Sequence, residues 1–211
     1  MTYPIPLEVV ELGARLSRRP LAPQPGRRAA VLVLLAPPES AAETASNLVF
    51  IEKTRHLRFH AGQIAFPGGS IEPDDHGPVA AALREANEEA GIDPESVSVL
   101  GLLPEGAITH SGFAVSSVLG WWGDPGPLTV GDRGEIAATH VISVPDLLEP
   151  DHRLTWLHPR GMTGPGFRVG DLFIWGFTAK VLDTMFTLAG WARPWDPRRT
   201  EPIPERFLPP N

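Results

Sequence analysis

The residues with the clearest chemical potential are three glutamates, Glu85, Glu88 and Glu89. If this segment is a helix, their i, i+3 and i+4 spacing places all three carboxylates on one helix face. Carboxylates this close repel one another and destabilise the helix unless a cation lies between them. Mg²⁺ and Mn²⁺ prefer such oxygen ligands. The pattern therefore indicates either a divalent-metal site or a solvated acidic face, which is the commoner role of glutamates on a helix.

The flanking residues favour the metal site. Arg84 lies four residues before Glu88, so it can hold a carboxylate without occupying the metal position. Gly68 and Gly69 precede the helix, and glycine lets the backbone approach an ion and phosphates closely. We expect the carbonyl oxygen of Gly68 to be a metal ligand. The candidate catalytic segment thus runs from Phe66 to Ile92.

This segment resembles the Nudix box, G-x5-E-x7-R-E-U-x-E-E-x-G-U, in which U is aliphatic. The matching residues are Gly69, Arg84, Glu85, Glu88, Glu89, Gly91 and Ile92, with Ala86 at an aliphatic position. Asp75 replaces the first glutamate, and eight residues instead of seven separate it from Arg84. The resemblance implies an α/β fold, a Nudix-type α/β/α sandwich with a mixed β-sheet. It also implies Mg²⁺- or Mn²⁺-dependent hydrolysis of a nucleoside diphosphate linked to another group, X.

Both departures resemble the Nudix subfamily that cleaves coenzyme A, which carries the same insertion and prefers aspartate there. Upstream, residues 57–69 resemble its L-R-x-H-x-G-x-x-x-F-P-G-G signature. Three later stretches resemble its T-x-S-G-F-x-V, N-E-V-A and W-G-x-T-A motifs, namely residues 109–115, 134–137 and 175–179. The start of the signature departs, with Ile51, Lys53 and Thr54 where the subfamily has Thr, Arg and Ser. The implied products are 4′-phosphopantetheine, or its acyl form, and adenosine 3′,5′-bisphosphate.

The resemblance also implies a role for each candidate residue. The glutamates of the box hold the metal, and Glu135 is an additional carboxylate that ligates a second metal or orients water. One of these four carboxylates takes a proton from the attacking water, and Arg84 braces a carboxylate. The candidates for substrate binding are the cationic and polar residues beside the metal loop: Lys53, Arg55, Arg58, His60 and Gln63. The first three of these are candidates for the 3′-phosphate of coenzyme A.

Two alternatives stay open. Lys53 keeps the charge of the arginine that it replaces but loses the bidentate fork, which leaves the substrate less defined than the reaction. The substrate could then be ADP-ribose, NADH or an oxidised nucleoside triphosphate. The other alternative is a non-catalytic regulatory domain that binds a nucleotide. Such domains usually lose carboxylates of the box, and this chain keeps Glu85, Glu88 and Glu89.

Composition limits the partners. The formal net charge of −7 disfavours binding to nucleic acid, which needs a basic surface, but permits a small nucleotide bound through a metal. The chain has no cysteine, which excludes disulfides, thiolate metal sites and cysteine nucleophiles. The longest apolar run, Ala29–Ala36, is too short to span a bilayer. We therefore expect a cytoplasmic protein that binds a small nucleotide and neither nucleic acid nor membrane.

Hydrophobic spacing predicts the elements that position these residues. It indicates helices at 6–18, 78–90 and 176–188, and strands at 29–36, 48–53, 97–103, 113–121, 136–144, 153–158 and 167–175. A hairpin turn is expected at residues 169–172. The predicted organisation is an N-terminal helix and linker at 1–27, the catalytic domain at 28–190, and a proline-rich tail at 191–211. The tail is expected to be extended or poorly ordered, and it or the first helix could contact a second subunit of a homodimer.

Overall fold

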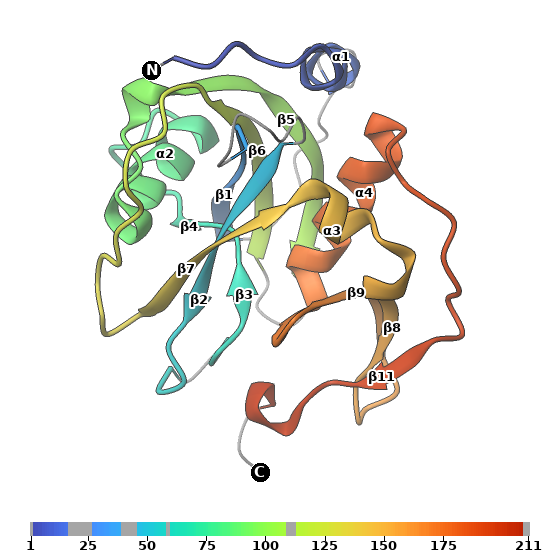
Figure 1. Ribbon diagram of the computed structural model, residues 1–211. Coiled ribbons are helices and arrows are strands. Elements are labelled where there is room, and N and C mark those ends of the chain that lie inside the picture. Colours follow the sequence, from blue (N-terminus) through green and yellow to red (C-terminus); the bar gives the residue numbers. More distant parts are fainter. Residues whose placement is uncertain (1, 17–26, 39–45, 58–59, 109–112, 209–211) are drawn as a thin grey trace.

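The computed structural model describes residues 2–16, 27–38, 46–57, 60–108 and 113–208. These residues form an α/β fold in which a mixed sheet has helices on both faces, as the sequence predicted (Figure 1). Most of the linker predicted after the first helix, within residues 1–27, lies outside the described residues. Among the helices that the structure describes, none is both long and apolar enough to cross a bilayer.

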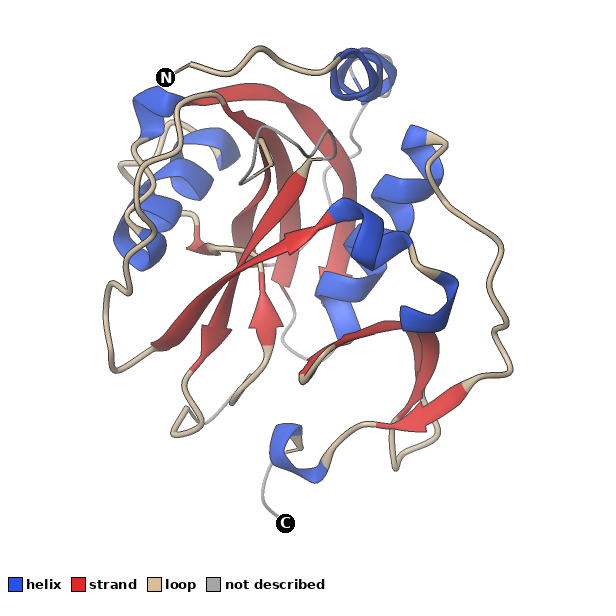
Figure 2. Cartoon of the chain, in the orientation of Figure 1, coloured by secondary structure: helices blue, strands red, loops and turns tan. Residues whose placement is uncertain are grey.

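The predicted helices and longer strands are all present (Figure 2). The helices are α1 (Leu7–Leu16), α2 (Pro78–Ala90), α3 (Val144–Leu148) and α4 (Gly176–Ala189). The strands are β1 (Arg27–Ala36), β2 (Asn47–Lys53), β3 (Ile64–Ala65), β4 (Gly68–Ser70), β5 (Val97–Ile108), β6 (Phe113–Trp122), β7 (Ile136–Ser143), β8 (Arg153–Leu157), β9 (Thr163–Val169), β10 (Leu172–Ile174) and β11 (Thr200–Pro202). The elements that the sequence did not predict are α3 and the short strands β3, β4 and β11.

Strand β1 organises the main sheet. Its strands run in the order β3-β2-β1-β6-β5, with β4 beside β1 and β7 beside β2, and only β1 and β6 are parallel among these pairs. On the other edge of β1, β2 pairs at Leu35 and Ala36, whereas β4 pairs at residues 29–31. Because β2 leaves β1 after two residue pairs, β4 takes its place. The split places the two glycines of β4 beside β1 and under α2.

The core lies on both sides of this sheet. Leu32 and Leu34 pack with the alanines of α2, whereas Val33 and Leu35 face the side covered by α1 and α4. A strand that is covered on both faces needs apolar residues at successive positions, which explains the unbroken apolar run of β1. The main sheet is therefore packed on both faces, and it holds the residues at the ends of its strands in place.

A second sheet was not predicted. It has the order β10-β9-β8-β11, and its β9–β10 hairpin turns at Gly170, as expected, with a φ of 57°. The tail is extended, as expected, but it packs onto this sheet: β11 runs parallel to β8, and Ile203 and Phe207 are buried. The proline-rich composition did not predict this packing, because the side chains that carry it, Ile203 and Phe207 among them, recur with no regular period.

Candidate active site

Helix α2 presents the three candidate glutamates beside the strand pair β1–β4. Pro78 occupies its first turn, and Gly91 ends it in the left-handed conformation, with a φ of 70°. Its buried face is made of Ala81, Ala82, Ala86 and Ala90. The residues after the helix also fix its end, because the Gly131 N–H donates to the Glu89 carbonyl over 3.0 Å. The small buried face lets the helix lie close to the sheet.

The glycines of β4 make close packing against α2 possible. A side chain at Gly69 would collide with the carboxylate of Glu85. At Gly68 it would collide with the carbonyl oxygen of Ala30 and with Val31 on the neighbouring strand. A side chain at Gly68 would therefore require the backbone of β1 to move, whereas at Gly69 the Glu85 carboxylate would have to move, because it lies directly against the backbone of β4.

Arg84 is the centre of the charge network at the solvent side of the site. Its Nε and Nη2 donate to the two carboxylate oxygens of Asp75 over 3.2 and 3.1 Å. Its Nη1 donates to Glu88 over 3.1 Å, and its Nη2 also reaches Glu85 at 3.2 Å. These hydrogen bonds from Arg84, together with one from the N–H of Glu72, hold the pKa of Asp75 below its usual value. Arg84 therefore joins the loop before α2 to two of the three glutamates.

Glu89 is the most buried of the three glutamates. Its side chain is 9% exposed, and Lys53 Nζ lies 2.6 Å from its Oε1. Its Oε2 accepts a hydrogen bond of 2.8 Å from the N–H of Gly68. A carboxylate buried to this degree needs such partners, because burial without them disfavours the ionised form. Glu89 thus ties α2 to both β2 and β4.

Glu135 reaches the same site from the start of β7. Lys53 Nζ lies 3.9 Å from its carboxylate, which is 59% exposed. Thr54 fixes this loop, since its N–H donates to the Glu135 carbonyl over 2.7 Å and its hydroxyl to the Gly134 carbonyl over 2.9 Å. The structure therefore brings Glu135 near Glu89 through Lys53, although the two are 46 positions apart in the sequence.

Glu85 has an unusual electrostatic environment. Burial raises the pKa of its carboxyl above the usual value, and repulsion from Glu89 and Glu88 adds to the rise, while Arg84 opposes it. A positive charge placed beside Glu85 would favour its ionised form. Burial thus disfavours the ionised form of Glu85, and Arg84 offsets this only in part.

The donor atoms of the site show whether these residues fit a divalent metal ion. The donors are carboxylate oxygens, with the backbone of Gly68 beside them, and Mg²⁺ and Mn²⁺ prefer oxygen donors. In the part of the chain that the structure describes, no three acidic or histidine side chains converge on a single point, because Lys53 and Arg84 hold the glutamates apart. The donor set fits such an ion in chemical type, and Lys53 occupies the position beside Glu89 that an ion would share.

The other candidates for substrate binding lie on the loop between β2 and β3. His60 Nδ1 and Gln63 Oε1 are 3.1 Å apart, with His60 exposed and Gln63 half-buried. Arg55 lines a cavity on the far side of β2 and β3. Arg58 lies outside the described residues, as do residues 109–112 of the predicted T-x-S-G-F-x-V stretch. Among the candidates that the structure describes, Lys53 is the one whose ion pairs with the carboxylates are seen.

Sequence reasoning missed two features of the site. It treated Asp75 only as a departure from the box, whereas both oxygens of this side chain are bound by Arg84. The spacing of eight residues between them could have suggested this pair, since a loop of that length can fold back on the first helical turns. It also missed Arg168 and Arg206, which line the same cavity as Arg55. No motif marks these two arginines.

Comparison with known proteins places this geometry in a family. The NUDIX domain model matches residues 26–160. An uncharacterized Nudix hydrolase, NudL, of Enterobacter sp. (strain 638) is 35% identical over 163 residues, which cover 74% of this chain and 79% of that protein. NudL of Cronobacter sakazakii is 37% identical over 164 residues, with the same coverage of 74% and 79%. A MutT/nudix family protein from Enterococcus faecalis shares the fold, with a TM-score of 0.54 and 16% identity over 81% of this chain and 64% of that one.

Proposed function

This chain belongs to the Nudix hydrolase family, and from that premise we propose that it cleaves the pyrophosphate of coenzyme A or its thioesters. Hydrolases of this family act on pyrophosphate-containing substrates and generally use divalent metals such as Mg²⁺ or Mn²⁺. The observation that carries the proposal is the charge network of the site. Arg84 forms ion pairs with Asp75, Glu85 and Glu88, and Lys53 forms one with Glu89. The choice of coenzyme A rests on three sequence features. They are Asp75 in place of the first glutamate of the box, the one-residue insertion between Asp75 and Arg84, and the signature at 57–69.

In the proposed reaction, water attacks one phosphorus of the pyrophosphate, and the bond from this phosphorus to the bridging oxygen breaks. Bound Mg²⁺ or Mn²⁺ would neutralise the phosphate oxygens and stabilise the leaving phosphate. Glu85, Glu88 and Glu89 would hold the ion together with the carbonyl oxygen of Gly68. A carboxylate of the site accepts the proton that the attacking water loses. Glu135 is a candidate for this role, because its side chain is exposed to solvent. The products are 4′-phosphopantetheine, or its acyl form, and adenosine 3′,5′-bisphosphate.

The cations of the chain orient these carboxylates. Arg84 holds Glu88 and Glu85 in fixed directions through hydrogen bonds of 3.1 and 3.2 Å. Lys53 pairs with Glu89 at 2.6 Å. With a metal ion bound to Glu89, the ammonium group of Lys53 would be available to a phosphate oxygen of the substrate. Lys53 would then be a substrate-binding residue as well as a partner of Glu89.

A substrate panel tests the proposal. We would measure kcat/KM for coenzyme A, acetyl-coenzyme A, dephospho-coenzyme A, ADP-ribose, NADH and 8-oxo-dGTP, with Mg²⁺ and with Mn²⁺. The proposal expects coenzyme A or its thioester to have the highest value. A preference for ADP-ribose, NADH or 8-oxo-dGTP would keep the hydrolase and replace the substrate. Nucleotide binding without turnover of any compound would favour the regulatory domain instead.

The contact between Gly69 and Glu85 gives a prediction of its own. Gly69→Ala should lower kcat about tenfold to a hundredfold, because the new methyl group displaces the Glu85 carboxylate and small misplacements of catalytic groups are costly. The matched control is Gly126→Ala, since a side chain at Gly126 meets no atom within 4 Å. Initial rates on the best substrate of the panel provide the measurement. Equal rates for Gly69→Ala and the control would show that this position of Glu85 is not needed.

A further inference from the structure

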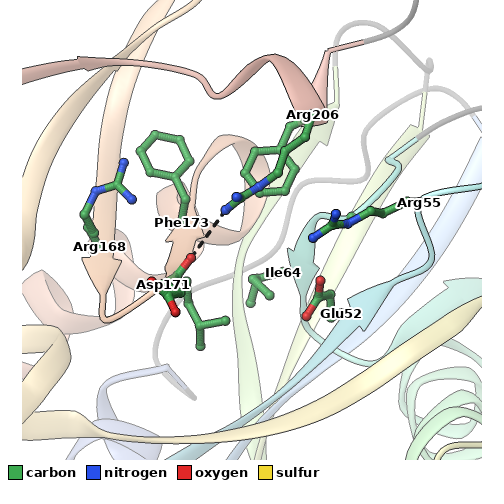
Figure 3. Close-up of a pocket in the computed structure, with 10 residues that line it drawn as sticks. Glu52, Arg55, Ile64, Arg168, Asp171, Phe173 and Arg206 are labelled. Carbon is green, nitrogen blue, oxygen red and sulfur yellow. Dashed lines mark hydrogen bonds between the residues drawn. The ribbon is translucent and has the colours of Figure 1, made fainter.

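A cavity lies behind β2 and β3, on the side away from α2. Its volume is about 370 Å³, and it is bounded by the end of β2, by β3, by the β9–β10 hairpin and by the C-terminal turn at residues 205–207 (Figure 3). Ile64, Phe173 and Phe207 form its apolar wall, and the rings of the two phenylalanines stack with centroids 6.2 Å apart. The volume is in the range of small-molecule sites.

The C-terminal turn closes this cavity through a contact with the loop after β2. A Cβ at Gly62 would lie 3.3 Å from the ring of Phe207 and 3.6 Å from Cγ of Arg55. Gly62 has a φ of 67°, which glycine adopts without strain. The ring of Phe207 and the stem of Arg55 thus both lie close to the backbone of Gly62. The tail is therefore part of the cavity wall, although it is remote in sequence from the glutamates.

Three arginines line the cavity, and their partners differ. Arg168 is already neutralised, because its Nε and Nη2 donate to one oxygen of Glu201 over 2.8 and 2.5 Å. Arg206 lies over the ring of Phe207, and within the described residues its one hydrogen bond is to the backbone carbonyl of Asp171, over 3.4 Å. Arg55 forms no ion pair with any residue that the structure describes. Arg55 and Arg206 therefore keep guanidinium groups without a carboxylate partner among the described residues.

These two guanidinium groups point into the same space. Figure 3 shows Arg55 and Arg206 directed toward the opening between Ile64 and Asp171. Glu52 and Asp171 lie at the edges of this space, and Glu52 is engaged by His140 at 3.1 Å. The site thus offers donors to a phosphate, acceptors to hydroxyl or amino groups, and an apolar wall. A phosphorylated nucleoside has this combination of groups.

The cavity is joined to the glutamates by the backbone of β2 and β3. Glu52 lines the cavity, and the next residue, Lys53, contacts Glu89 on the other side of the strand. Ile64 also lines the cavity, and four extended residues, at most about 13 Å, carry the chain from there to Gly68. The cavity and the glutamates are therefore connected by a short length of backbone, within the reach of one extended nucleotide.

We propose that Arg55 and Arg206 bind a phosphomonoester on the nucleoside half of the substrate, which in coenzyme A is the 3′-phosphate. This inference rests on the proposed function for the identity of the substrate, and it adds the C-terminal turn to the substrate site. Guanidinium groups form paired, charge-assisted hydrogen bonds to phosphate oxygens, so two of them favour a phosphate dianion over a hydroxyl group.

Binding of product analogues tests this proposal without hydrolysis. We would measure Kd by calorimetry for adenosine 3′,5′-bisphosphate, adenosine 2′,5′-bisphosphate and adenosine 5′-monophosphate. The full-length protein should bind the 3′,5′-bisphosphate at least about tenfold more tightly than the monophosphate. Arg206→Gln and Arg55→Gln should each reduce this preference severalfold. Both side chains are exposed, so neither change threatens the fold.

Arg198→Gln is the matched control, because this arginine is 89% exposed and pairs with Asp196 away from the cavity. It should keep the wild-type preference. Equal Kd values for the bisphosphate and the monophosphate, or an unchanged preference in Arg206→Gln, would overturn the phosphate site. Tighter binding of the 2′,5′-bisphosphate would overturn its assignment to the 3′-phosphate. Failure of the proposed function would appear separately, as a protein that binds these nucleotides but does not hydrolyse coenzyme A.

Discussion

Glu89→Gln should lower kcat by about a thousandfold in saturating Mg²⁺. Glutamine has the size of glutamate, and its carbonyl oxygen can still accept the 2.8 Å hydrogen bond from the N–H of Gly68. It carries no charge, so it is a poor ligand for a divalent ion and leaves Lys53 without its partner at 2.6 Å. The change therefore removes one negative charge from the site and largely keeps the shape of the side chain. Steady-state kinetics on the best substrate, with Mg²⁺ titrated, provides the measurement.

The control for this change is Glu95→Gln, which alters an exposed glutamate shortly after α2. It should keep the wild-type kcat and the wild-type dependence on Mg²⁺. The melting temperature of each variant separates a loss of charge from a loss of fold. A Glu89→Gln protein that remains folded and retains more than a tenth of the wild-type kcat would remove Glu89 from the metal-binding set.

Arg84→Gln should lower kcat/KM by about a hundredfold, the upper end of the effect of residues that orient metal ligands. Three carboxylates lose a shared cation, and Asp75 is 7% exposed, so it cannot turn to water to replace that partner. Glu85 and Glu88 would lose hydrogen bonds of 3.2 and 3.1 Å and become free to change direction. Two quantities would be compared between the variant and the wild type. A change in the Mg²⁺ concentration at half-maximal rate indicates altered metal binding, and a change in kcat at saturating Mg²⁺ indicates altered turnover.

A double-mutant cycle with Asp75→Asn isolates the pair. Because Arg84 acts partly through Asp75, the double variant should be much less impaired than the product of the two single effects. Strictly multiplicative effects would mean that the two side chains act independently. In that case Asp75 would not be the residue that positions Arg84.

The sequence predicted helix α2 and the long strands well, because their apolar residues recur with the period of each element. Pro78 and Gly91 gave both ends of α2. The strands β3 and β4 were missed, since each is only two or three residues long and is held by its neighbours. Their formation depends on β1 and β2, which offer an edge at the right place. Such dependence on partners leaves no periodic pattern in the sequence.

The site was predicted in part for the same physical reason. The glutamates share one helix, so local spacing places them together. Contacts between segments that are distant in the sequence could not be predicted from local spacing. Examples are the contacts of Lys53 with Glu89, of Phe207 with Gly62, and of Arg206 with the cavity. The second sheet and the packed tail belong to this group. A proline-rich tail carries no pattern that predicts where Phe207 will pack.

The most direct test of the central claim is ³¹P NMR of coenzyme A incubated with the full-length protein and Mg²⁺. The pyrophosphate signals should disappear while phosphomonoester signals of 4′-phosphopantetheine and adenosine 3′,5′-bisphosphate grow, and a chelator in excess over Mg²⁺ should stop the change. Pyrophosphate signals that persist in the presence of Mg²⁺ or Mn²⁺, with folded protein at high concentration, would contradict it.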